Sequence, residues 1–352
     1  MPKPFDFAPG LRRPATPTNE IEKRLGRFLA DLRRRKAADA DAEAMLDPVS
    51  ASDWDRIARR ARKLHEAQRK VQTNPNLKKE DWEQLSAVFE GISLQGPATE
   101  HHANEIAADL LEEMPWMRQA IEHIWRDMRR AAARGYGLRF RPILLDGPPS
   151  VGKTHLARSL ARLCRVPEVS IDIGAGSDGF RLVGSTRNWG RSTPGRVVET
   201  VLAHRVANPV VFVDEVEKAG VMQMTGGAST SVITALLGMI EPSSASRWEC
   251  PYLAVKFDLS RVNWILASND IRLMSRPLLS RCRVVFLREL TRCELFEFAE
   301  RQIRKRGLDD GALENVAALM QAMPDGHLDL CLRGVLRIID DLEALGEFPP
   351  LS

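Results

Sequence analysis

The residues with the clearest chemical potential form the run GPPSVGKT, which fits the spacing G-x-x-x-x-G-K-T. The run comprises Gly147, Pro148, Pro149, Ser150, Val151, Gly152, Lys153 and Thr154. Glycines let the backbone wrap closely, so that successive N–H groups and the start of the next helix point at a phosphate. Lys153 would then neutralise phosphate charge, and the Thr154 hydroxyl would ligate Mg²⁺. An apolar stretch before the run and a helical pattern after it favour a phosphate-binding loop over an ordinary Gly/Pro turn.

A second chemical feature is the pair of carboxylates at Asp214 and Glu215, directly after the apolar stretch Val210–Val213. A strand of a parallel sheet would expose both at its carboxyl end, the edge where ligands of open α/β sheets bind. Asp214 would hold Mg²⁺ through its water shell, and Glu215 would polarise the water that attacks a terminal phosphate. Alone, Asp-Glu after a strand is an ordinary solvated turn. Beside a phosphate-binding loop, the catalytic interpretation is favoured.

The elements that must position these residues follow from the pattern of apolar residues. Short apolar runs alternate with longer amphipathic segments, which predicts an α/β fold with a parallel sheet covered by helices. The predicted strands are Pro142–Leu145, Val169–Ile173, Val210–Val213, Asn263–Ala267 and Val284–Leu287. A helix from about Asn104 toward Arg134 should break at Pro115, because proline cannot donate to a continuous helical ladder.

Three regions are predicted along the chain: a helical N-terminal region at 1–103, the α/β domain at 104–288 and a helical C-terminal region at 289–352. In the first region, Ser52 with Asp55 resembles a capping box that opens a helix. The last region begins with Thr291-x-x-Glu294, a second capping box.

Composition excludes several classes of protein. A chain of 352 residues is long enough for two or three domains, and 44% hydrophobic residues is too many for a disordered chain. The formal net charge of +4 does not imply bulk attraction to nucleic acid or to a membrane. Five scattered cysteines without a C-x-x-C pair indicate free thiols in a reducing compartment. With no signal peptide and no membrane-spanning run, a cytoplasmic protein is expected.

From about Met114 to its end, the chain resembles the AAA+ ATPases and, within them, the ATPase module of Lon proteases. Six blocks in family order carry the resemblance. They are Trp189–Val197, Asp214–Lys218, Ala235–Pro242, Phe257–Ser260, Pro277–Arg281 and Cys331–Leu336. The resemblance implies an AAA+ P-loop NTPase sheet flanked by helices, with the C-terminal helices as a lid over bound ATP.

The resemblance also implies roles for residues outside the two motifs. Asn269 would be sensor 1, an amide that orients the attacking water. Arg281 would be the arginine finger that reaches the ATP of a neighbouring subunit, with Arg283 as the less favoured choice. Arg333 would be sensor 2, which carries the nucleotide state into the lid, and Arg337 one turn later is the alternative.

Trp189 is the residue that would contact the substrate, because the family has an aromatic pore loop here that grips an extended polypeptide. The alternative is a tryptophan packed under its own loop. A second pore-facing loop is expected at Met222–Ser231. Two departures from the family pattern stand out. Ser150 replaces the usual glycine at a variable position of the phosphate loop, so we expect binding to survive. Gly190 follows the aromatic where an aliphatic residue is usual, which puts substrate grip in doubt.

The expected function is that of a Lon-like ATPase that binds ATP and Mg²⁺ and unfolds, translocates or remodels protein substrates. The expected partners are copies of the same chain in a hexameric ring, a protein substrate, and a separately encoded peptidase or adaptor. Fifteen residues follow Arg337, too few for a protease domain, so no peptide cleavage is expected. The alternative is an AAA+ ATPase that remodels nucleic acid through its basic N-terminal helices.

Overall fold

The structure is a computed structural model that describes residues 4–11, 15–39, 49–71, 77–86, 88–175, 178–185, 192–219, 221–222, 230–324 and 326–347. The chain divides into two compact units, a smaller one of Ala8–Phe89 and a larger one of Met1–Phe7 with Glu90–Ser352. The domain boundaries expected after residues 103 and 288 stay predictions. Among the helices described, none is long and apolar enough to cross a bilayer.

The larger unit is built on a parallel sheet of five strands in the order β2-β3-β8-β1-β9. The strands are β1 (Ile143–Asp146), β2 (Glu168–Asp172), β3 (Val210–Asp214), β8 (Asn263–Ser268) and β9 (Arg283–Phe286). Each lies within one residue of a predicted strand, so the predicted α/β class is confirmed. In the register of the sheet, Asp146 lies beside Ser268 and Asp172 beside Asp214. Polar residues at the carboxyl ends of four strands therefore meet at one edge.

Two short antiparallel pairs lie outside this sheet and were not expected. They are β4 (Val221–Met222) with β5 (Thr230–Ser231), and β6 (Trp248–Cys250) with β7 (Val255–Phe257). Strands of two or three residues are too short to show an alternating pattern, so sequence periodicity cannot find them.

The larger unit also contains the helices that surround the sheet. They are α4 (Glu100–Glu113), α5 (Arg118–Ala132), α6 (Lys153–Cys164), α7 (Asp178–Val183), α8 (Arg196–His204), α9 (Val232–Ile240), α10 (Pro242–Ala245) and α11 (Arg276–Leu279). The apolar faces of α4, α5 and α6 form one buried cluster with residues of β1, β3 and β8. The predicted break at Pro115 is confirmed, since α4 ends at Glu113 and the 3-10 turn Pro115–Met117 precedes α5.

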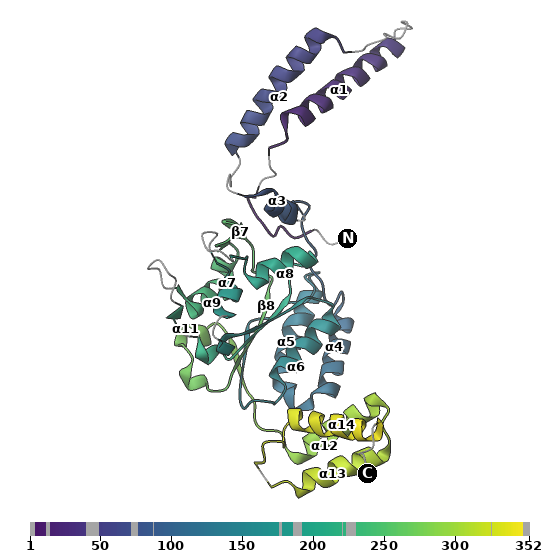
Figure 1. The fold of residues 1–352 in the computed structure, drawn as a ribbon, viewed down its shortest axis with the longest axis vertical. Coiled ribbons are helices and arrows are strands. Elements are labelled where there is room, and N and C mark those ends of the chain that lie inside the picture. Colours follow the sequence, from purple (N-terminus) through teal and green to yellow (C-terminus); the bar gives the residue numbers. More distant parts are fainter. Residues whose placement is uncertain are drawn as a thin grey trace. The chain divides into compact units, whose positions relative to one another are not determined.

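The C-terminal helices form a cluster with a core of its own, drawn in yellow and yellow-green in Figure 1. They are α12 (Arg292–Arg306), α13 (Asp310–Ala322) and α14 (Leu332–Glu347). The predicted capping box at the start of α12 is confirmed: the Thr291 side chain accepts from the Glu294 N–H, and the Glu294 carboxylate accepts from the Thr291 N–H. Hydrogen bonds from Arg288 and Thr291 hold the pKa of Glu294 at about 2.

The smaller unit holds the helices α1 (Thr18–Asp39), α2 (Ala51–Val71) and α3 (Lys79–Ser86). The capping box expected at Ser52 and Asp55 is wrong, because the cap of α2 is made two residues earlier. There the Asp53 carboxylate accepts from the Ser50 N–H at 3.0 Å, and the Ser50 hydroxyl accepts from the Asp53 N–H at 3.3 Å. Asp53 also binds Arg33 of α1 at 2.7 Å, so the cap of one helix ties it to the other.

Two buried asparagines join segments of the larger unit that lie far apart in the sequence. Asn208 accepts a hydrogen bond from the Gln95 N–H at 2.9 Å and donates to the carbonyls of Gln95 and Leu138 at 2.7 and 2.9 Å. Asn263 accepts from the Phe140 N–H at 3.1 Å and donates to the Asn208 carbonyl at 3.1 Å. These bonds hold the segments that lead into β1, β3 and β8 at the amino edge of the sheet.

Replacing Asn208 with alanine should destabilise the protein strongly, because it leaves the Gln95 N–H without its acceptor and removes one of the two donors to each of the Gln95 and Leu138 carbonyls. We expect a loss of about 3 kcal/mol in the free energy of unfolding, measured by denaturant titration. The matched control is Asn315→Ala on the exposed face of α13, which should change the free energy by less than about 0.5 kcal/mol. Equal effects in the two variants would contradict the importance of the buried network.

Candidate functional site

The phosphate-binding loop connects β1 to α6 and has the backbone shape that the sequence predicts. Gly152 has a φ of 98°, and Ser150 has a φ of 61°, a left-handed conformation that costs a residue with a Cβ about 1–2 kcal/mol. A Cβ at Gly147 would lie 2.5 Å from the Leu287 carbonyl, so only glycine fits there. Ser150 departs from the family pattern at a position where glycine would be unstrained.

Lys153 provides the cation at the centre of the site, and only 6% of the surface of this residue is exposed to solvent. Its ammonium donates hydrogen bonds to the carbonyls of Gly147 at 2.8 Å and Ser268 at 2.9 Å, and to Asn269 Oδ1 at 2.8 Å. Burial lowers the pKa of Lys153, although the Asp214 carboxylate opposes the shift. The cation is therefore held by oxygens from the residue that follows β1, from the last residue of β8 and from the residue that follows β8.

Asp214 and Glu215 lie at the carboxyl end of β3, as expected. Burial raises the pKa of Asp214, and a hydrogen bond from the Glu215 N–H at 2.9 Å opposes that shift. Glu215 has a φ of 51°, and its carboxylate accepts from Lys218 Nζ at 2.7 Å. A Cβ on Gly174 would overlap this carboxylate in its present position, so a larger residue there would force the Glu215 side chain to turn away.

Asn269 lies where β8 ends, within reach of the loop. Its side-chain oxygen accepts from Lys153, while its N–H and its Nδ2 both donate to Glu217 Oε1 at 3.2 Å. The amide thus bridges the cation of the phosphate loop and a carboxylate that follows β3. The two motifs found in the sequence are joined through Asn269.

A cavity of about 500 Å³ lies against these residues, a size that suits a nucleotide. It is lined by Pro149, Ser150, Gly152, Lys153, Thr154, His155, Arg158, Asp214, Glu215, Asn269, Phe298, Gln302, Leu332, Arg333 and Leu336. Helices α12 and α14 supply one wall and the phosphate loop another. Of the two candidates for sensor 2, Arg333 lines the cavity, whereas Arg337 Nη1 binds Asp329 Oδ1 at 3.1 Å.

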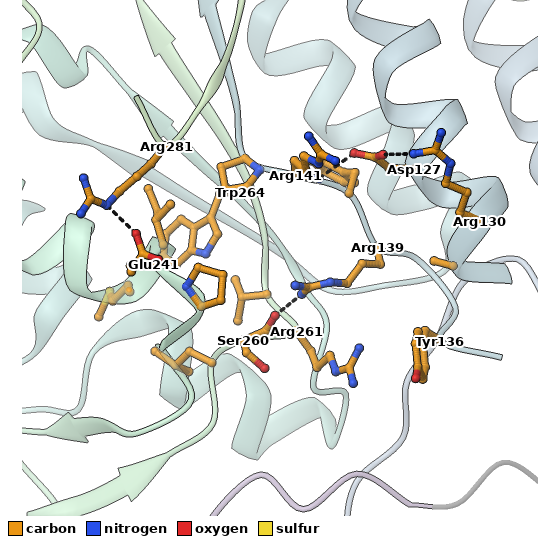
Figure 2. Close-up of a pocket in the computed structure, with 18 of the residues that line it drawn as sticks. Asp127, Arg130, Tyr136, Arg139, Arg141, Glu241, Ser260, Arg261, Trp264 and Arg281 are labelled. Atoms are coloured by element: carbon orange, nitrogen blue, oxygen red, sulfur yellow. Dashed lines mark hydrogen bonds and ion pairs between the residues drawn. The ribbon is translucent and has the colours of Figure 1, made fainter. Parts of the chain in front are cut away.

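Arg281 lies in a different place, outside the wall of this cavity. It lines a second cavity of about 710 Å³ and binds Glu241, as Figure 2 shows. Trp189 and Gly190 fall outside the described residues, and so does most of the second pore loop expected at Met222–Ser231. The structure thus brings together the residues predicted for the phosphate site, and it places Arg281, which was predicted to serve a neighbouring subunit, elsewhere.

The residues present fit Mg²⁺, the metal that the predictions require. Thr154 and Asp214 both line the cavity and offer oxygen donors, which this hard cation prefers. Among the described residues, Asp146 Oδ1 and Glu217 Oε2 are buried without a hydrogen-bond partner. Both carboxylates influence the Lys153 ammonium, so the edge of the sheet carries more negative charge than its own lysine pairs.

Sequence reasoning missed several residues of the site. Glu217 holds Asn269, Lys218 holds Glu215, and Gly174 makes room for Glu215. Glu217 and Lys218 follow the predicted carboxylates at once, so their proximity was a signal. Trp116, in the turn before α5, gave no signal in the sequence. Its Nε1 donates to the Val151 carbonyl at 2.9 Å, and its ring packs edge-on against the ring of Phe298 of α12, with 6.1 Å between the ring centres.

The fold and the phosphate loop together are those of the P-loop class of nucleotide-binding domains. Residues 143–290 match the family described as "ATPase family associated with various cellular activities (AAA)". This part of the chain is therefore an AAA-type module, and in sequence it resembles the corresponding part of Lon proteases.

The relatives that resemble this chain include Lon proteases. Lon protease of Magnetococcus marinus is 32% identical over 190 residues, which are 53% of this chain and 23% of the relative. Lon protease of Clostridium beijerinckii is 27% identical over 277 residues, 70% of this chain and 34% of the relative. The chain thus spans about a quarter to a third of the length of these relatives.

Among solved structures, the Thermotoga maritima RuvB Holliday junction branch migration motor is similar with a TM-score of 0.42 and 19% identity. The similarity covers 64% of this chain and 61% of that chain.

Replacing Asp214 with asparagine should raise the melting temperature of the protein without nucleotide. Because the folded-state pKa of Asp214 is raised, its ionised form destabilises the folded protein, and this cost fades as the pH falls through that pKa. The gain in melting temperature should therefore be larger at pH 8 than at pH 5. The control is Asp109→Asn on the exposed face of α4. A lower melting temperature for Asp214→Asn at pH 8 would contradict the assigned cost.

Proposed function

We propose that this protein hydrolyses ATP in a ring of identical subunits, a hexamer, and uses the energy to unfold, translocate or remodel protein substrates. The observation that carries the proposal is the cavity of about 500 Å³ in which Lys153, Asp214, Glu215, Asn269 and Arg333 lie together. A protein that only bound a nucleotide would need the cation and the loop, but not a carboxylate and an amide placed to act on water.

Each residue has a distinct task in this proposal. Lys153 exchanges its three oxygen acceptors for oxygens of the β- and γ-phosphates, which releases Asn269 to orient the attacking water. Glu215 accepts a proton from that water as it attacks the γ-phosphorus. Thr154 and Asp214 would hold Mg²⁺, which supplies charge neutralisation of the phosphate oxygens when bound. Arg333 neutralises phosphate charge from the side of α14.

Glu215 is not free to act as a base while Lys218 Nζ donates to it at 2.7 Å. In our proposal the carboxylate leaves Lys218 when nucleotide fills the cavity, so that hydrolysis starts only after binding. Side-chain rotation suffices, because the pair is partly exposed and such pairs are weak.

Assembly into a ring is supported by the position of Arg281. Its guanidinium lines a cavity other than the one that holds Lys153, so it would serve the ATP of a neighbouring copy. An arginine supplied in this way makes hydrolysis depend on assembly. Protein as the substrate is supported by the sequence relatives, which are proteases by name, and by Trp189 in the predicted pore loop. The expected absence of peptide cleavage stays a prediction.

Replacing Glu215 with glutamine should abolish turnover and preserve ATP binding. The amide keeps the shape of the side chain but cannot accept the proton, so we expect the turnover number to fall at least about 100-fold. Binding of ATP, measured by calorimetry, should stay within about threefold of the unchanged protein. Glu199→Gln, an exposed change on α8, is the control for turnover. Normal hydrolysis by Glu215→Gln would overturn the catalytic assignment.

Replacing Trp189 with alanine should separate hydrolysis from work on the substrate. We expect a basal ATPase rate within about twofold of normal and at least about a tenfold loss in the unfolding of a fluorescent test protein, because the aromatic grip is gone. Trp189→Phe should retain most of the unfolding rate. If DNA rather than unfolded protein stimulates the ATPase of the unchanged protein, the nucleic-acid alternative is correct and the protein-substrate proposal fails.

A further inference from the structure

The second cavity, shown in Figure 2, lies at the edge of the sheet opposite the phosphate loop. Residues 139–142 lead into β1, residues 259–262 lead into β8, and Arg281 stands two residues before β9. The cavity therefore borders the amino ends of these strands, whereas the phosphate loop follows the carboxyl end of β1. A group that acts from this cavity cannot belong to the phosphate site of its own chain.

The Arg281 guanidinium is held in one orientation by two acceptors of its own chain. Its Nε donates to Glu241 Oε2 at 2.8 Å, and its Nη1 donates to the Pro277 carbonyl at 2.9 Å. The described residues provide no acceptor for Nη2. The exposed fractions of the two charged side chains are 35% for Arg281 and 39% for Glu241. Nε and Nη1 are thus engaged, and the outer edge of the guanidinium, at Nη2, is left for an anion.

The backbone of Glu241 is fixed independently of its side chain. Its N–H donates to the Leu237 carbonyl at 3.0 Å, and its carbonyl accepts from the Ala245 N–H at 2.8 Å. Although Glu241 is the N-cap residue of α10, its side chain makes no capping hydrogen bond. The carboxylate therefore serves Arg281 and can be removed without opening the helix.

We propose that Glu241 is a positioning residue for the arginine finger, and this inference rests on the proposed function of Arg281. By holding Nε, Glu241 keeps the outer edge of the guanidinium ready to bind the terminal phosphate of ATP in the adjacent copy. An arginine loses side-chain freedom when it is fixed, and Glu241 removes that freedom before the phosphate arrives. The pair is too exposed to contribute much to stability, so its importance lies in the hydrolytic step.

The test compares steady-state ATP hydrolysis by the full chain and four variants, at concentrations where all are assembled. Arg281→Ala should lower the turnover number about 1,000-fold. Glu241→Ala should lower it about tenfold with the KM for ATP within twofold, the size of effect seen when a supporting partner of a functional group is lost. Glu241→Gln should retain most of the activity, since its amide oxygen still accepts from Nε. The matched control, Glu249→Ala on β6, should be normal.

A double variant decides whether Glu241 acts through Arg281. If it does, Arg281→Ala with Glu241→Ala should be no slower than Arg281→Ala alone. Three results overturn the inference: normal or faster turnover in Glu241→Ala, a further tenfold loss in the double variant, or loss of assembly shared by both Glu241 variants. Full activity of Arg281→Ala would instead refute the proposed finger itself, and the positioning role with it. A slow Arg281→Ala with a normal Glu241→Ala refutes the positioning role alone.

Discussion

The buried ammonium of Lys153 sets the condition that the rest of the site must meet. A charge removed from water is costly unless oxygens surround it, and here they come from the phosphate loop, from the last residue of β8 and from Asn269. Two of these are backbone carbonyls, so the strands themselves must hold the correct register. The pairing of Asp146 with Ser268 in neighbouring parallel strands provides it. The position of one cation thus depends on the whole central sheet.

The same edge of the sheet carries acidic groups that burial makes costly. The raised pKa of Asp214 and the unpaired oxygens of Asp146 and Glu217 are two signs of one condition, an excess of negative charge with too few partners. A site with this unfavourable electrostatic energy persists only because interactions elsewhere in the fold stabilise the folded state. The buried asparagines at the opposite edge of the sheet and the apolar cluster beneath α4, α5 and α6 provide this stabilisation. In our proposal, the Mg²⁺ that accompanies the nucleotide would offset part of this excess.

Residues that act through a short motif could be predicted from the sequence, whereas residues that act through contacts between distant segments could not. The phosphate loop and Asp214 with Glu215 follow strands that the apolar pattern locates within a residue, so their common edge could be predicted. The surroundings of Glu215 could not be predicted. Gly174 belongs to a different βα connection, and it affects Glu215 only because it has no side chain to occupy the space of the carboxylate. The cap of α2 was misplaced by two residues, since Ser50 and Ser52 both suit a cap and the Asp53–Arg33 contact decides between them. Trp116 contacts the loop from 35 positions away.

By itself, the sequence determined the class of chemistry and the kind of fold. The spacing of glycines, lysine and threonine, followed by carboxylates after an apolar strand, specifies a phosphate site locally, because these groups act through backbone shape and immediate neighbours. Only the tertiary structure decided where each arginine lies. Arg333 and Arg337 lie one turn apart and are equivalent in the sequence, yet Arg333 lines the cavity beside the phosphate loop and Arg337 binds Asp329. Arg281 likewise shows its partner Glu241 only after folding, because a long side chain meets its partner wherever packing brings the two segments together.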